Sequence, residues 1–152
     1  MARKLLIPTD GSEAAEKAAD FGLDWATSCG YQVICLNVIK PVEAVIGNSL
    51  EYLFVEEKDS IAKELLNLGE KAVNKVAEKA ALKGLKIKTT TMEAPQVEKA
   101  IIEVAKKEKV DLIVLGMHGE GCSILLSGEM GSVTRRLLSS PPPCPVTVIP
   151  PG

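Results

Sequence analysis

Residues 31–39, YQVICLNVI, are apolar on both faces of the strand that they predict. A half-exposed antiparallel strand alternates apolar and polar side chains, whereas a strand covered on both faces does not. Burial of both faces is typical of a parallel sheet with its crossover helices on each side. We therefore expect an α/β protein.

Strand and helix patterns alternate along the whole chain. The predicted strands are residues 4–9, 31–39, 85–92, 110–115 and 146–149, and the predicted helices are residues 14–28, 56–83, 95–109 and 131–139. For 152 residues this pattern indicates a single domain, residues 1–152, which contains an open parallel sheet of five strands with helices on both faces.

Two helices carry apolar stripes that predict which face each one buries. The first stripe consists of Ala14, Ala18, Phe21, Gly22 and Trp25. The second consists of Ile61, Leu65, Leu68, Ala72, Val76 and Ala80. Asp10 or Ser12 can cap the first helix, and residues 28–30 end it. Residues 40–57 are too apolar for a free linker, so they either pack as a short helix or loop or cover a site or partner surface.

The stretch from residue 110 to 133 is unusually rich in glycine. Its apolar run stops at Gly116, and the glycines at positions 116, 119, 121, 128 and 131 precede the next predicted helix. Glycine allows the backbone to approach a ligand closely or to adopt positive φ. A strand, a glycine loop and a helix N-terminus in this order predict an anion site, because the first amides of a helix lack internal partners.

Polar residues and glycines follow two of the predicted strands: PTDG at residues 8–11 follows the first, and the glycine-rich segment from Gly116 onward follows the fourth. Open parallel sheets bind ligands beyond the carboxyl ends of strands where the winding reverses. If both segments border one crevice, the first and fourth strands are neighbours, which gives the sheet order 3-2-1-4-5. Each feature alone has a simpler interpretation, since Asp10 can be only a helix cap and each glycine only a turn.

Several phosphate-binding and catalytic patterns are absent from the sequence. Neither GxxxxGK[ST] nor a GxGxxG after the first strand occurs, and no loop lysine or arginine is placed to neutralise phosphates. We therefore expect binding by backbone dipoles with a divalent metal, for which Glu120 and Glu129 are candidates. His118 is the single histidine and is a candidate phosphate contact or, less favoured, a proton donor.

Composition excludes other classes of function. The net charge of −2 and the scattered aromatic residues argue against nucleic-acid binding. No apolar run is long enough to span a membrane, and Pro8 interrupts the short apolar run at the start, so we expect a cytoplasmic protein. The four cysteines lack CxxC spacing, which favours reduced thiols over a zinc site.

Five stretches together resemble the universal stress protein family. They are KLLIPTDGS at 4–12, LNV at 36–38, DLIVLGMHG at 111–119, GSVT at 131–134 and CPVTVI at 144–149. The resemblance covers nearly the whole chain and implies a Rossmann-like fold of the adenine nucleotide alpha hydrolase type that binds ATP with Mg²⁺. The candidate nucleotide-binding residues are then Pro8, Thr9, Asp10, Val38, Leu115, Gly116, Gly119, Gly121, Gly131, Ser132 and Val133.

The glycine loop departs from the pattern of the ATP-binding members, in which nine residues separate Gly-x-x-Gly from Gly-Ser. Eleven residues separate Gly119 from Gly131, whereas nine separate Gly121 from Gly131. The loop is therefore extended by two residues between Met117 and Gly121. We expect this extension to bulge and leave the phosphate cradle in place.

The last predicted strand, Val146, Thr147, Val148 and Ile149, offers a short apolar edge. An unpaired edge invites pairing with another chain, and two-fold pairing would make a homodimer, as the resemblance also implies. The alternative is an edge covered by the chain's own tail.

The sequence thus predicts a homodimeric ATP-binding sensor or switch with an unknown protein partner and at most weak ATPase activity. The alternatives are an enzyme of adenylyl or pyrophosphate chemistry and a nucleotide-free dimeric interaction module.

Overall fold

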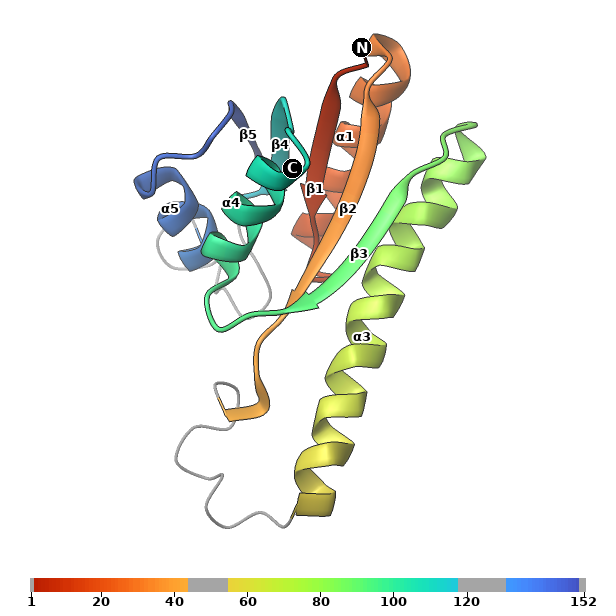
Figure 1. Ribbon diagram of the computed structural model, residues 1–152. Coiled ribbons are helices and arrows are strands. Elements are labelled where there is room, and N and C mark those ends of the chain that lie inside the picture. The colour runs from red at the N-terminus through yellow and green to blue at the C-terminus, as the bar shows by residue number, and fades with distance from the viewer. Residues whose placement is uncertain (1, 44–54, 118–130, 151–152) are drawn as a thin grey trace.

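A five-stranded parallel sheet forms the centre of the protein (Figure 1). The computed structural model describes residues 2–43, 55–117 and 131–150. The strands are β1 (Lys4–Pro8), β2 (Gln32–Ile39), β3 (Lys88–Glu93), β4 (Leu112–Gly116) and β5 (Val146–Ile149). Their order is β3-β2-β1-β4-β5, which confirms the predicted topology. Leu6 of the central strand lies opposite both Ile34 and Ile113.

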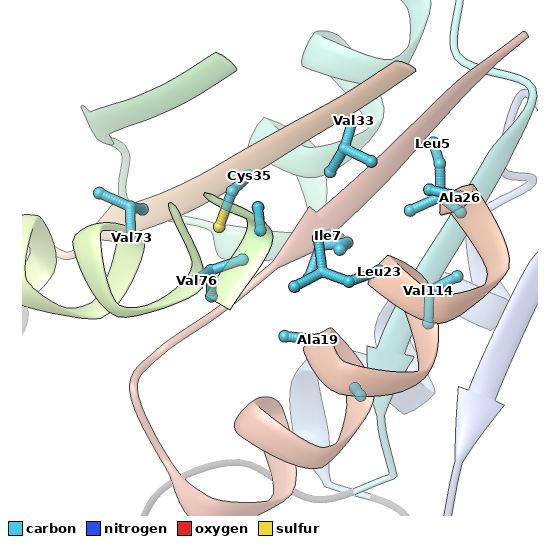
Figure 2. Packing of buried hydrophobic residues seen from close by; sticks show 12 residues of the cluster. Leu5, Ile7, Ala19, Leu23, Ala26, Val33, Cys35, Val73, Val76 and Val114 are labelled. Carbon is cyan, nitrogen blue, oxygen red and sulfur yellow. The ribbon is translucent and has the colours of Figure 1, made fainter. Parts of the chain in front are cut away.

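In the described part of the chain, two helices cover each face of the sheet. On one face lie α1 (Glu13–Cys29) and α3 (Val55–Leu82), and on the other lie α4 (Val97–Lys107) and α5 (Ser132–Ser139). Figure 2 shows the cluster beneath α1 and α3, where Leu5 and Ile7 of β1 meet Leu23 and Val76. A second cluster, around Leu6 and Ile101, fills the other face. Both faces of the sheet are therefore buried, as the apolar run at residues 31–39 predicts.

Local signals fix the ends of α1. The Ser12 hydroxyl accepts a hydrogen bond from the Ala15 amide at 3.2 Å, so Ser12 rather than Asp10 is the cap. At the other end Gly30 has φ 74°, the left-handed conformation that commonly terminates a helix. No helix in the described part of the chain is long and apolar enough to cross a membrane.

The predicted buried face of α1 is wrong by about one residue. Phe21 and Trp25 are 40% and 43% exposed, and the helix instead buries Ala15, Ala18, Ala19, Gly22, Leu23 and Ala26. The physical reason is close packing: a Cβ atom on Gly22 would lie 2.9 Å from Cδ1 of Ile7. Only small side chains let the helix approach the sheet so closely, and the two aromatic rings do not fit there.

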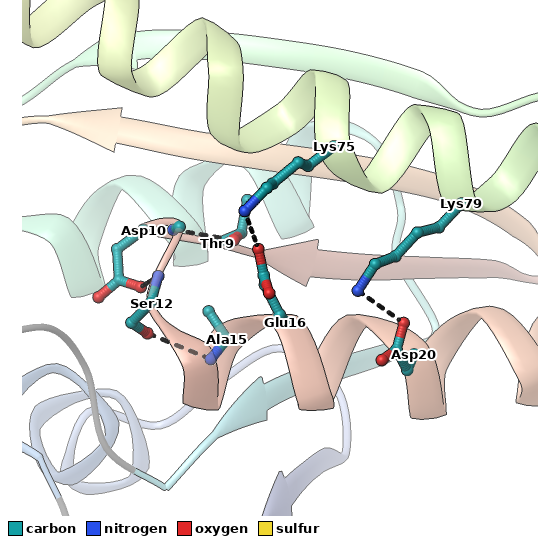
Figure 3. Close-up of polar contacts among 9 residues, drawn as sticks. Thr9, Asp10, Ser12, Ala15, Glu16, Asp20, Lys75 and Lys79 are labelled. Carbon is teal, nitrogen blue, oxygen red and sulfur yellow. Dashed lines mark hydrogen bonds and ion pairs between the residues drawn. The ribbon is translucent and has the colours of Figure 1, made fainter.

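Ion pairs join α1 to α3 along their exposed flank (Figure 3). Glu16 pairs with Lys75 at 2.6 Å and Asp20 with Lys79 at 3.0 Å, and Asp24 pairs with Lys83 one turn further on. The hydrogen bond from Lys75 lowers the pKa of Glu16. Exposed pairs of this kind contribute little stability individually.

The N-terminal half of α3 is less buried than its apolar stripe predicts. Ala72, Val76 and Ala80 are buried, but Leu68 is 56% exposed. Figure 1 shows that this half of the helix extends past the end of the sheet, so it has no strand to cover.

The fold predicts how the cysteine thiols react. Burial raises the pKa of the Cys35 thiol on β2 to about 12, whereas Cys29 is exposed at the end of α1. Because the thiolate is the reactive form, Cys35 should resist alkylation by iodoacetamide at neutral pH while Cys29 is modified. Peptide mass spectrometry after timed labelling measures both rates, and unfolding in urea should abolish the difference. Equal rates in the native protein would contradict the packing of β2.

Candidate functional site

The chain forms a cavity of about 590 Å³ beyond the carboxyl ends of the central strands. β1 pairs with β2 on one side and with β4 on the other, so the winding of the sheet reverses at β1. Open parallel sheets place ligand sites at such a reversal. The volume lies within the range of pockets that hold small molecules or cofactors.

Most of the candidate residues line this one cavity. They are Pro8, Thr9, Asp10, Val38, Leu115, Gly116, Gly131, Ser132 and Val133. Gly119 and Gly121, as well as His118, Glu120, Glu129 and the two-residue extension, lie outside the described residues, as do positions 44–54. The structure therefore brings together segments from β1, β2, β4 and α5 that are far apart in the sequence.

The segment after β1 is held by its own polar groups (Figure 3). The Thr9 amide donates to the Leu36 carbonyl at 2.8 Å, and the Thr9 hydroxyl accepts from the Gly11 amide at 3.2 Å. The Asp10 carboxylate accepts from the Ser12 amide at 2.9 Å and is exposed beside the cavity. Gly11 has φ 81°, which lets the chain turn sharply here. Asp10 is thus an anchored acceptor within reach of a ligand.

The N-terminus of α5 supplies hydrogen-bond donors. The first bond of the helix runs from the Arg135 amide to the Gly131 carbonyl at 3.0 Å, and the N-cap residue, Gly131, has no side chain to cap this end. Among the described residues, no acceptor satisfies the amides of Ser132, Val133 and Thr134. Such amides, together with the helix dipole, favour an anion.

The Gly131 amide is engaged within the protein. It donates to the Met117 carbonyl at 2.7 Å, so this donor is already used. What Gly131 offers is the absence of a side chain at the wall of the cavity. The adjoining Thr134 hydroxyl donates to the Gly116 carbonyl at 2.9 Å, which ties α5 to the end of β4.

Apolar side chains also line the cavity. Val38 and Leu115 are joined there by four residues that sequence reasoning missed: Leu65, Leu68, Val97 and Ile101. They come from α3 and α4, whose approach to the site depends on tertiary packing. Side chains of this type can cover the faces of a planar base.

Asn37 and Gly69 form a tight contact in the cavity wall. The Asn37 amide group donates to the Thr9 carbonyl at 2.9 Å, while its buried Oδ1 has no protein partner in the described part of the chain. A Cβ atom on Gly69 would lie 2.4 Å from that Oδ1. Gly69 is therefore required for α3 to pass over Asn37. A lone glycine inside a long helix was the sequence signal for this contact.

Lys40 is a cation at the cavity that the sequence analysis did not place there. It directly follows β2, lines the cavity and is exposed. It was missed because it lies after a strand end that carries no glycine or turn motif. Its ammonium group gives the cavity a positive charge in addition to the α5 dipole.

Known proteins with this fold and sequence form one family. The sequence model of the universal stress protein family matches residues 1–150. Universal stress protein MJ0531 of Methanocaldococcus jannaschii is 32% identical over 148 residues, which cover 97% of this chain and 81% of that protein. The solved structure of MJ0577, from the same organism, is 27% identical with a TM-score of 0.77 and covers 100% of this chain and 98% of its own.

Two further solved structures with the same fold are nucleotide complexes. One is a universal stress protein with cAMP, 20% identical with a TM-score of 0.68, matched over 97% of this chain and 96% of that one. The other is the universal stress protein of Archaeoglobus fulgidus with dAMP, 19% identical with a TM-score of 0.58, matched over 97% of both chains. The family model and the relative at 32% identity show that this chain belongs to the universal stress protein family.

Proposed function

We propose that this protein binds ATP in the cavity beyond β1 and β4 and acts as a nucleotide-dependent switch. The observation that carries the proposal is the N-terminus of α5, whose first amides border a cavity with apolar lining residues and have no acceptor among the described residues. An anion site beside an apolar slot suits a phosphorylated ligand with a planar base. The cAMP and dAMP complexes of structural relatives support an adenine nucleotide.

Described residues of the cavity are assigned to parts of the nucleotide: the base, the ribose or the phosphates. Val38 and the side chains from α3 and α4 cover the base, and Asp10 accepts hydrogen bonds from the ribose or the adenine amino group. The amides of Ser132 and Val133 receive the phosphates, with Gly116 and Gly131 leaving room for them. Lys40 lines the same cavity and adds positive charge.

Mg²⁺ fits this site as a companion of the phosphates rather than as a resident ion. Among the described residues no three metal-ligating side chains come together, and Asp10 is the one carboxylate in the cavity wall. Mg²⁺ is commonly held by one carboxylate together with phosphate oxygens and waters. The ion would neutralise the part of the negative phosphate charge that the single positive charge of Lys40 does not balance.

The switch acts through α5. This helix begins at the proposed phosphate site and leads within a few residues to β5, the edge strand. β5 pairs with β4 on one side, and we propose that its other side pairs with a second copy to form a homodimer. Movement of α5 on nucleotide binding would then reach the dimer edge and a protein partner in the cytoplasm.

No arginine lines the cavity within the described residues, so we expect hydrolysis to be slow at most.

Identification of the bound nucleotide tests the proposal directly. Heat denaturation of the purified protein should release ATP, and Mg-ATP at about one hundred times its dissociation constant should raise the melting temperature by roughly 5–10 °C. ADP and AMP should shift it less, because they carry fewer phosphates to α5. Absence of both release and shift at millimolar ATP would favour a nucleotide-free interaction module, and rapid formation of AMP would favour an enzyme.

Substitution Gly131→Val tests the placement of the phosphates. The branched side chain would fill the space in front of the Ser132 and Val133 amides and should weaken ATP binding by more than about tenfold, or 1.4 kcal/mol. Isothermal titration calorimetry measures the affinity, and an unchanged oligomeric state in sedimentation shows that the fold is intact. Wild-type affinity in a folded variant would mean that the phosphates bind elsewhere.

The charge of Lys40 can be tested with a matched pair of variants. Lys40→Ala should weaken ATP binding up to about fivefold, the effect expected of an exposed charge, and this loss should shrink in high salt. Lys71→Ala removes an exposed lysine of α3 that does not line the cavity, so it should leave the affinity unchanged. Equal effects of the two variants would show only a general influence of net charge.

A further inference from the structure

Two large aromatic side chains lie exposed on α1. Phe21 and Trp25 are 40% and 43% exposed, and their rings stack with centroids 5.9 Å apart and planes 27° apart. Aromatic side chains of this size are the ones that dominate the energetics of cores and interfaces. On a helix that otherwise buries Leu23 and several alanine and glycine residues, this pair does not belong to the core clusters.

The aromatic pair points away from α3. Asp20 pairs with Lys79 of α3 and Asp24 with Lys83, which directly follows α3, and Phe21 and Trp25 each follow one of these aspartates in the sequence. One residue rotates the side-chain direction by about 100° around a helix, in this case to the flank opposite the ion pairs. The buried stripe of α1 separates the two flanks, since Gly22 and Ala26 lie against the sheet.

That flank of α1 lies beside the free edge of the sheet. α3 contacts β2 and β3, whereas α1 contacts β1, β4 and β5. β5 is the last strand in the order, so no strand or helix of the described chain covers this face beyond α1. Gly22 packs on Ile7 and Leu5, on either side of Leu6. The strand registers place Leu6 level with Ile113 and Val146, so Phe21 lies near the first half of β5.

The outer edge of β5 has a defined hydrogen-bonding pattern. The carbonyls of Pro145 and Ile149 accept from β4, and backbone groups alternate in direction along a strand. The amides and carbonyls of Val146 and Val148 therefore point to the free edge. The four residues of β5 span only about 13 Å. Pairing of so short a strand with its copy buries less than the roughly 1,200 Å² of surface that a stable interface buries.

We infer that the Phe21–Trp25 pair of α1 is the second element of the surface through which two copies of this chain associate. The inference rests on the homodimer proposed above. Antiparallel pairing of β5 with its copy has a two-fold axis perpendicular to the sheet, which leaves both α1 helices on the same face. The aromatic flank of one copy then faces that of the other across the axis.

The spacing across this axis requires large side chains. With α1 above β4 and strands about 4.8 Å apart, the two α1 axes would be about 14 Å apart. Helices packed directly against each other are about 8–10 Å apart. The large side chains of phenylalanine and tryptophan can fill the extra space between the two helices. The exposed parts of Phe21 and Trp25 from both copies add on the order of 300 Å² to the interface.

Matched variants test the surface. Phe21→Glu and Trp25→Glu should each weaken dimerisation by at least about tenfold in sedimentation equilibrium, because each buries a charge in the interface. Leu82→Glu is the control, since Leu82 is 89% exposed at the far end of α3. Val148→Pro removes an outward amide of β5 without removing a bond to β4, so it should also give monomers.

The single tryptophan gives an independent readout in the wild-type protein. Trp25 emission should shift to the red on dilution through the dimer dissociation constant and should be red at every concentration in Val148→Pro. If the glutamate variants dimerise like wild type while Val148→Pro is monomeric, the role of the aromatic pair is wrong and the β5 dimer stands. If wild type is a monomer at about 100 μM, both dimer proposals fail, and ATP binding is tested separately by the melting shift.

Discussion

The pairing of β1 with both β2 and β4 is the constraint on which the rest of the structure depends. Leu5, Leu6 and Ile7 are fully buried between the two neighbouring strands and the helices on both faces. Because the winding reverses at this strand, the segment after β1 and the segment after β4 end at the same crevice. The cavity, the α5 amides and the exposed Asp10 are all consequences of that arrangement.

Much of the fold and part of the candidate site follow from local sequence signals. Strand periodicity and the two polar strand ends were enough to predict the sheet order, and the resemblance to the universal stress protein family implied nine residues that line the cavity. Residues contributed by α3 and α4, such as Leu65 and Ile101, could not be predicted, because the angle at which a helix crosses a sheet depends on side-chain packing along its whole length. Lys40 was missed since a lone lysine after a strand resembles any solvated charge.

The error in α1 has a general physical cause. Hydrophobicity alone places Phe21 and Trp25 in the core, but the distance between helix and sheet is determined by the smallest side chains between them. Alanine and glycine bring α1 close to β1, and the two aromatic residues are displaced to its flank, whereas Leu23 stays buried. Size as well as polarity therefore decides which stripe of a helix faces a sheet.

The contact between Gly69 and Asn37 has a consequence for the alignment of α3. The three lysines that pair with α1 recur every four residues, and Lys71 continues the series. A slip of α3 by one helical turn would therefore re-form the same number of ion pairs, so these charges cannot distinguish the two alignments. The slip would bring Leu65 to the place of Gly69, where even a Cβ atom lies 2.4 Å from Asn37. One missing side chain thus selects the native alignment of a 28-residue helix.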